Sequence, residues 1–303
     1  MVELRIYLLT YETMDRIGIV VDEVAGLSEE VVQENKIETV KAKLDWPDLE
    51  QQPGENTFQK MRELDKKGIV SFGKTSQPSP KNFLDAYKKQ FERFEEIICI
   101  TITSKLSGTH NSAIQAVKFL PEEQQDKVFV VDSLSAAGGQ TLLVMKALDL
   151  IKENKGIKEI GQELIDCVPQ IRAFLVLKDL KWIEKSGRIS SLAAKIARRM
   201  SEVGIRPLLS FKRGLLKPVG IKMGAKDVPT ALFAQFKKEN KTGDGQRIRV
   251  VIDHGDDPAG AQRLVDMIEK DFETAEIVFV GLLNNLVGTI TGPDTLVLSW
   301  LKD

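Results

Sequence analysis

The chain has 303 residues, of which 42% are hydrophobic and 29% charged, so it can form one large domain or two domains with a sizeable core. Its 43 Lys and Arg residues nearly cancel its 44 Asp and Glu residues, which argues against a nucleic-acid partner, because phosphates require a basic surface. No apolar run approaches the roughly 18 residues of a membrane-spanning helix. Residues 1–16 do not resemble a secretory signal, because Glu3 and Arg5 interrupt the apolar stretch. We expect a cytoplasmic protein without an integral membrane segment, and transient membrane contact stays open.

The predicted elements alternate between strand and helix along most of the chain. We expect strands or extended runs at 17–22, 37–44, 69–73, 97–102, 128–132, 173–177, 205–211, 215–223, 247–253, 275–283 and 292–300. We expect helices at 28–35, 56–67, from Pro80 onward, at 111–119, 139–152 and 158–168, before Gly187, and at 191–203, 227–238 and 258–270, with a polar loop at 45–55.

This alternation predicts an α/β fold, because a strand, a helix and a second strand usually form a right-handed crossover in a parallel sheet. We expect an N-terminal extension (residues 1–16), an N-terminal domain (17–170) and a C-terminal domain (171–303). Each domain is expected to hold a mainly parallel sheet flanked by helices. The apolar run at 97–102 (IICITI) is typical of a central strand that is covered on both faces.

The cysteine, histidine and glycine patterns argue against several kinds of site. Cys99 and Cys167 lie in apolar runs, where a buried free thiol is the ordinary explanation. His110 and His254 are far apart in the sequence, and no pair of cysteines has the spacing of a zinc site, so we expect no metal. The chain also lacks the G-x-G-x-x-G fingerprint of dinucleotide-binding proteins and the G-x-S-x-G elbow of many hydrolases. We therefore expect no cofactor.

Three predicted strands in the first half run directly into loops that are rich in hydroxyl groups. The loops are residues 74–79 (KTSQPS), 103–109 (TSKLSGT) and 133–139 (SLSAAGG). In a parallel sheet such loops gather at the carboxyl edge, where hydroxyls and the free N–H groups of helix N-termini can receive an anion. Capping of the following helix explains any one of these loops equally well. The residues alone therefore indicate an anion or polar-headgroup site and no more.

At these loops the sequence resembles the DegV family of bacterial fatty-acid-binding proteins. The matching runs are IVVDEVAGL at 19–27, TSQPSP at 75–80, SKLSGTHNSA at 104–113, VVDSLSAAGGQ at 130–140, SGRIS at 186–190, IRPLL at 205–209 and TGPDTL at 291–296. The resemblance extends from about residue 17 to the end of the chain, and the order and spacing of its motifs fit the family.

The resemblance implies that a long-chain fatty acid is buried between two domains and that a separate fatty acid kinase subunit phosphorylates its carboxylate. By this resemblance Thr75 and Ser107 hydrogen-bond the carboxylate, helped by the backbone N–H of Gly108, and Ser76 and His254 are secondary candidates. Arg188 is the candidate for contact with the acyl phosphate or the kinase subunit, although a loop arginine that ties two segments together is an equal alternative. The protein itself is then not an enzyme.

Three positions depart from the family pattern. Glu23 follows Asp22 where the family usually has serine, Ile290 stands where a histidine often helps to hold the carboxylate, and His110 replaces a usual tyrosine. A lipid sensor or storage protein without a kinase partner is therefore an alternative. A serine hydrolase with Ser107 as nucleophile and His110 or His254 as base is a weaker alternative, because the base must lie within hydrogen-bond reach.

Overall fold

The computed structural model describes residues 15–189, 207–221, 227–240 and 245–302, together with Leu192, Lys195 and Arg199. Most of the predicted helix at 191–203 and nearly all of the predicted N-terminal extension lie outside the described residues, as do one position of the SGRIS motif and two of the IRPLL motif. In the part of the chain that is described, no helix is long and apolar enough to cross a membrane.

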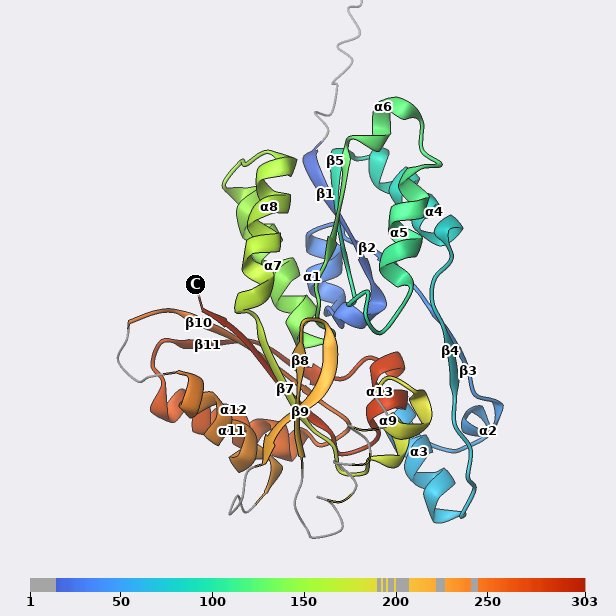
Figure 1. Cartoon of the computed structure of the whole chain (residues 1–303), viewed down its shortest axis with the longest axis vertical. Coiled ribbons are helices and arrows are strands. Elements are labelled where there is room, and N and C mark those ends of the chain that lie inside the picture. Colours follow the sequence, from blue (N-terminus) through green and yellow to red (C-terminus); the bar gives the residue numbers. More distant parts are fainter. Residues whose placement is uncertain are drawn as a thin grey trace, which may run out of the picture.

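The first sheet has four parallel strands among the described residues, in the order β2-β1-β5-β6. These strands are β1 (Asp15–Asp22), β2 (Glu38–Val40), β5 (Phe94–Thr101) and β6 (Val128–Asp132). Figure 1 shows the helices on its two faces, α7 (Gly138–Lys152) and α8 (Ile157–Cys167) on one and α4 (Pro80–Phe91) and α5 (Thr109–Val117) on the other. Short helices connect these elements, namely η1 (Glu23–Ala25), α1 (Glu29–Glu34), α6 (Glu122–Gln125) and η2 (Val168–Gln170).

The apolar run in β5 has the central position that its sequence predicts. Ile98 and Ile100 pack on the face covered by α7 and α8, whereas Ile97 and Cys99 pack on the face covered by α4 and α5. Both faces of the strand are buried, so both sets of alternating side chains are apolar.

The second sheet has six strands within the described ranges, in the order β11-β10-β12-β7-β8-β9. They are β7 (Arg172–Val176), β8 (Pro207–Lys212), β9 (Leu215–Ile221), β10 (Ile248–His254), β11 (Ala275–Leu282) and β12 (Leu296–Lys302). On one face lie α11 (Val228–Glu239) and α12 (Pro258–Asp271), and against the other lie α7, α9 (Lys181–Ser186) and α13 (Asn285–Thr291).

The expectation of a mainly parallel second sheet is wrong, because among its described pairs only β10 and β11 run parallel. One reason is the turn between β8 and β9, where Arg213 and Gly214 both have positive φ (52° and 79°). Such a two-residue turn reverses the chain and makes the strands antiparallel. The other reason is β12, which inserts between β10 and β7 and runs antiparallel to both.

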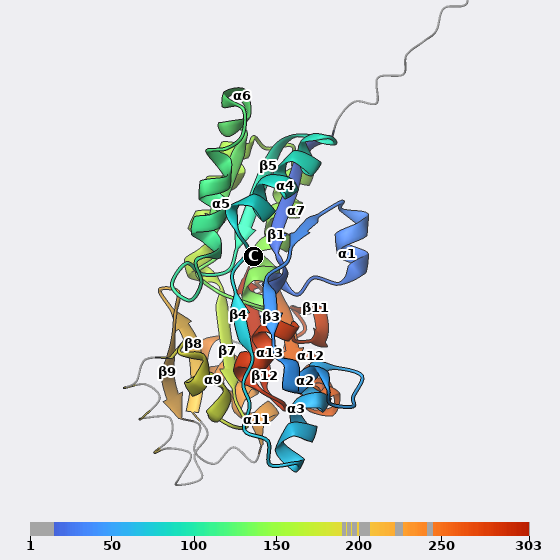
Figure 2. The ribbon, with the colours of Figure 1, turned by 90° about the vertical axis from the view of Figure 1, so that its right-hand side faces the viewer.

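Residues 43–76 form a segment that leaves the first sheet and packs beside the second, and we name it the crossing arm. It consists of β3 (Lys43–Asp45), α2 (Pro47–Glu50), α3 (Thr57–Lys66) and β4 (Lys74–Ser76), with β3 and β4 paired antiparallel. Figure 2 shows β3 and β4 running down to α2 and α3, and α3 packs against α13. The arm therefore belongs to the first half by sequence and to the second half by packing.

Aromatic side chains fix the crossing arm to the second half. Phe58 of α3 is fully buried, and its ring fills the space beside the backbone of Gly288 in α13. The rings of Trp46 and Phe72 lie 5.9 and 5.4 Å from that of Trp182 in α9. Such aromatic clusters contribute both apolar burial and favourable ring geometry.

Charged groups make a second attachment of the arm. Arg62 of α3 forms ion pairs with Asp256 and, at 2.7 Å, with Asp294, both in loops at the end of the second sheet. Lys178 contacts the other carboxylate oxygen of Asp294 at 2.5 Å. The ion pairs are partly exposed, so their contribution to stability is modest compared with the buried rings.

Two predicted elements differ from the structure. Residues 69–73 are not a strand, because Ile69 and Val70 are exposed and the strand is formed by the next three residues, Lys74–Ser76. The extended run at 37–44 divides into β2 and β3, and α13 was not predicted. The predicted boundary near residue 170 stays a proposal, and β7 begins just after it at Arg172.

Candidate functional site

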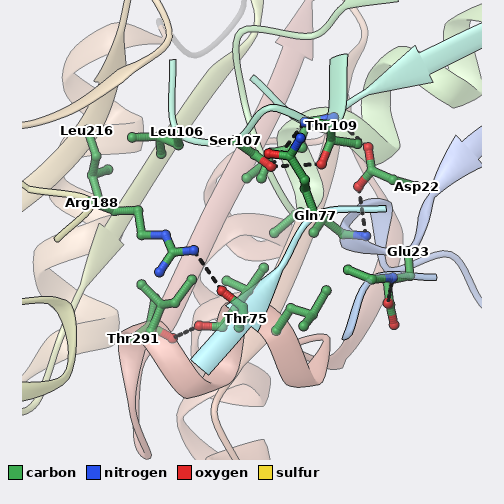
Figure 3. Close-up of a pocket in the computed structure, with 18 of the residues that line it drawn as sticks. Asp22, Glu23, Thr75, Gln77, Leu106, Ser107, Thr109, Arg188, Leu216 and Thr291 are labelled. Carbon is green, nitrogen blue, oxygen red and sulfur yellow. Dashed lines mark hydrogen bonds between the residues drawn. The ribbon is translucent and has the colours of Figure 1, made fainter. Parts of the chain in front are cut away.

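A cavity lies where the loops of the first sheet, the crossing arm and the second sheet meet. Its empty volume is about 910 Å³, counting the part open to solvent. Figure 3 shows lining residues contributed by all three regions.

The walls of the cavity are mainly apolar. The apolar lining residues are Val24, Ala42, Pro78, Ile102, Leu106, Ala136, Ala137, Leu175, Ile183, Phe211, Leu216, Leu286, Val287, Ile290 and Val297. They come from both halves of the chain, and those of the second half lie on β7, β8, β9, β12, α9 and α13. An apolar ligand in this cavity would therefore contact both halves at once.

Thr75 and Arg188 form a polar group in the wall. Thr75 lies in β4, and its Oγ1 accepts a hydrogen bond of 2.7 Å from the guanidinium of Arg188. Arg188 also donates to the backbone oxygen of Ser186, but no carboxylate partner is found for it among the described residues. Burial lowers the pKa of this arginine, which nevertheless keeps its charge. Figure 3 shows the two side chains pointing toward each other in the cavity.

Ser107 and Thr109 form a second polar group at the start of α5. The Ser107 Oγ lies 2.7 Å from the Thr109 Oγ1 and accepts a hydrogen bond of 3.2 Å from the Thr109 backbone N–H. Gly108 does not itself line the cavity. A Cβ on this residue would overlap the side chain of Gln77, which follows the arm directly, packs against the Gly108 backbone and lines the cavity.

Two acidic residues at the end of β1 also line the cavity. Asp22 is buried, and its carboxylate accepts hydrogen bonds from the backbone N–H groups of Ile102 (2.6 Å) and Val24 (3.1 Å). Burial raises the pKa of Asp22 to about 6. Glu23 is half-buried, and its Oε1 accepts a hydrogen bond of 2.5 Å from the Ala42 N–H.

The structure brings together some of the predicted site residues and separates others. Thr75, Ser76, Ser107 and Arg188 line one cavity, and Ile290 lines it as well. The other secondary candidate, His254, lies at the end of β10 and is not part of this wall. The prediction that three loops share the carboxyl edge of one parallel sheet is correct for the loops after β5 and β6 only. The Thr75 loop reaches the site from the crossing arm.

The arrangement gives little support to a serine nucleophile. The Ser107 Oγ is paired with Thr109, whereas the Nδ1 of His110 lies 3.0 Å from the Thr101 hydroxyl. Within the described residues neither histidine lines the cavity, so Ser107 has no base beside it there.

A string in the crossing arm, GIVSFGKT at 68–75, fits the sequence pattern of a phosphate-binding P-loop. A P-loop needs a strand before it and a helix that begins at its Lys and Thr. Here no strand precedes the string, and Lys74 and Thr75 lie in β4. The string is therefore not a nucleotide site. Nor do the described residues contain a group of three His, Cys, Asp or Glu side chains that could hold a metal ion.

Several lining residues were not singled out from the sequence. Gln77 and Thr109 lie inside the motifs that carry the family resemblance, so the predicted site residues next to them in the sequence could have pointed to them. The apolar residues of α13 gave none, because a short apolar segment is equally compatible with ordinary core.

Comparison with known proteins gives a consistent result. A sequence model described as "Uncharacterised protein, DegV family" matches residues 16–303. A Thermotoga maritima protein named "Fatty acid-binding protein" is 27% identical over 291 residues, which are 93% of this chain and 96% of that protein.

Two solved structures share the fold. One, described as fatty acid binding of a DegV family protein from Thermus thermophilus, has a TM-score of 0.79 at 23% identity and covers 95% of this chain and 100% of its own. The other, a DegV lipid-binding protein from Thermotoga maritima, has a TM-score of 0.73 at 25% identity and covers 95% and 98%. The predicted α/β fold class is confirmed by these likenesses.

Proposed function

Because this chain belongs to the DegV family, we propose that its cavity binds a long-chain fatty acid and presents the carboxylate to a separate kinase subunit. The observation that carries the proposal is the hydrogen bond of 2.7 Å between Arg188 and Thr75 in a mainly apolar wall. The names of the family relatives, which refer to fatty acid and lipid binding, support the same ligand.

The carboxylate is assigned to Thr75 and Ser107, with Arg188 supplying the positive charge. A half-buried arginine without an acidic partner in the described chain favours an anionic ligand, since the anion restores the electrostatic balance. The hydroxyl of Thr75, which accepts from Arg188, and that of Ser107, which lines the same cavity, orient the headgroup. Gly108 stays a candidate through its backbone N–H only.

The acyl chain supplies most of the affinity in this proposal. Each buried methylene contributes about 0.8 kcal/mol, so a sixteen-carbon chain gains on the order of 10 kcal/mol before the costs of ordering and association. The apolar walls from both halves give such a chain a continuous surface. The polar groups are then needed to fix the position of the headgroup rather than to hold the ligand alone.

Lipid analysis of the natively purified protein tests the binding proposal. Extraction and mass spectrometry should find close to one fatty acid per chain, and the emptied protein should take up palmitate or oleate. Arg188→Gln and Thr75→Val should each weaken palmitate binding by about tenfold or more, since a hydrogen bond to a charged group is worth roughly 1.5–3 kcal/mol. The exposed Arg93→Gln is the matched control. A protein that neither carries nor takes up any fatty acid would refute the proposal.

A second candidate function is lipid storage or sensing without a kinase partner. Glu23 and Ile290 favour it, because both line the cavity at positions where the family commonly has other side chains. Fatty acid loaded on this protein and mixed with its cognate ATP-binding subunit distinguishes the two functions. Formation of ADP that depends on the bound fatty acid supports presentation, and binding without such ADP formation supports storage.

A further inference from the structure

Glu23 places a carboxylate in the wall of the proposed fatty acid cavity. It begins the short helix η1, which follows β1 directly. Its Oε1 accepts the hydrogen bond from the Ala42 N–H, and no described Lys, Arg or His side chain forms an ion pair with it. The Oε2 has no protein partner among the described residues. The Oε2 is therefore available to accept a hydrogen bond from a ligand donor in the cavity.

Strand pairing brings this carboxylate to the polar end of the cavity. In the β3–β4 hairpin Lys43 pairs with Ser76 and Leu44 with Thr75, so Ala42, to which Glu23 is bound, lies beside Ser76 and Gln77. In Figure 3, Glu23 and Arg188 lie on opposite sides of Thr75. The same cavity wall therefore contains a cation, Arg188, and a carboxylate, Glu23, that forms no ion pair among the described residues.

An unsubstituted fatty acid fits only part of this site. Its carboxylate satisfies Arg188, Thr75 and Ser107, but it offers no donor to Glu23 and is repelled by the like charge. A hydroxyl group one or two carbons from the carboxylate supplies the donor and stays close to the anion. A hydrogen bond from such a hydroxyl to a carboxylate is of the strong, charge-assisted kind.

We propose that Glu23 adapts the cavity to acyl chains that carry a hydroxyl group next to the carboxylate, as in 2- and 3-hydroxy fatty acids. This inference rests on the proposed fatty acid binding and specifies its ligand class. Glu23 selects against unsubstituted fatty acids by charge repulsion and favours hydroxylated ones by accepting their hydrogen bond.

Competition between three ligands tests the inference. Palmitate, 2-hydroxypalmitate and 3-hydroxypalmitate each displace a fluorescent fatty acid from the wild-type protein and from Glu23→Gln and Glu23→Ser. At least one hydroxy acid should bind the wild type about tenfold more tightly than palmitate. Glu23→Gln keeps an acceptor for the Ala42 N–H but turns an amide donor toward the carboxylate, so it should bind palmitate more tightly and lose the preference. Glu23→Ser, which is too short to reach the ligand, should lose the preference too.

The controls separate this inference from the proposed function. Glu30→Gln removes an exposed charge in α1 and should retain the preference. Wild-type protein that binds palmitate as tightly as both hydroxy acids, or Glu23 variants that leave the ratio unchanged, would overturn the inference while fatty acid binding stands. Failure of all three acids to bind the wild-type protein would instead overturn the proposed function. Matching thermal transitions of the variants exclude a folding defect as the cause.

Discussion

The two sheets contribute to the cavity in different ways. The first sheet is parallel throughout, and it presents the loops that follow β5 and β6, which hold Ser107, Ala136 and Ala137. The second sheet is largely antiparallel, and it presents side chains from the faces of its strands, such as Leu175 and Val297. The first sheet thus contributes loop residues, with hydroxyl groups among them, and the second sheet contributes apolar side chains from a strand face.

The crossing arm contributes to the cavity in a third way. It carries Thr75 to the cavity from neither sheet, and Arg188 reaches the same point from the loop after α9. The headgroup site therefore depends on how firmly the arm is fixed to the second half. Three predictions test that dependence and the joint between the two sheets.

The largest effect is expected from Phe58→Ala in α3. This ring is fully buried, so its removal should lower the free energy of unfolding by about 3–5 kcal/mol through lost burial and a cavity. Chemical denaturation measures the change. Val70→Ala in the same arm is the control, since Val70 is 86% exposed and should change stability by less than about 0.5 kcal/mol. Equal effects of the two variants would mean that the arm is not fixed by its buried rings.

A smaller, pH-dependent effect is expected at Asp253, which joins the two halves. Its Oδ2 accepts a hydrogen bond of 3.0 Å from the Gly138 N–H at the start of α7, and burial raises its pKa to about 7. Because the folded pKa lies above the unfolded value, this residue favours folding most below about pH 4, and the benefit is lost as the pH rises through 7. Asp253→Asn retains the acceptor and cannot ionise, so its stability should fall less between pH 5 and pH 8 than that of the wild type.

Guanidinium unfolding at pH 5 and pH 8 measures this difference, which we expect to be about 1–3 kcal/mol. Asp22 has the same sign of shift, so a weaker pH dependence should remain in the variant. The exposed Asp126→Asn is the control. If the stability of Asp253→Asn depends on pH as strongly as that of the wild type, ionisation of Asp253 is not a source of this pH dependence.

The smallest effect is expected from Arg62→Met, which removes the ion pairs with Asp256 and Asp294. We expect a loss of about 1 kcal/mol, because all three side chains are partly exposed. The difference from the wild type should shrink at high salt, which screens such pairs. Lys66→Met removes a more exposed pair with Glu63 and should cost less. A loss of stability as large as that of Phe58→Ala would mean that the ion pairs stabilise the arm as much as the aromatic contacts do.

The sequence was most informative where local pattern and burial agree. The run in β5 is apolar at every position from Ile97 to Ile100, and only a strand covered on both faces needs this. Thr75, Ser107 and Arg188 were found through motifs, and they line one cavity. Their roles toward a ligand stay predictions.

The crossing arm could not be predicted, because helical periodicity in α3 reveals an apolar face but not the surface that covers it. Its partners Gly288 and Trp182 are far away in the sequence. The mainly antiparallel pairing of the second sheet depends on the insertion of β12 between β10 and β7. This insertion likewise depends on contacts between residues far apart in the sequence. Apolar residues of the cavity wall have the same composition as core residues, so no local signal separates them.

The packing of Phe58 also bears on synthesis of the chain. Its partners in the core, which include Leu175, Trp182 and Val297, follow it in the sequence and leave the ribosome later. Roughly 240 residues separate Phe58 from Val297, which at about 5–20 residues per second amounts to on the order of ten seconds or more. During this time the first sheet can close on α4 and α5 while the apolar face of the arm has no surface to cover it. The nascent protein therefore leaves part of this face uncovered until α13 and β12 have been synthesised.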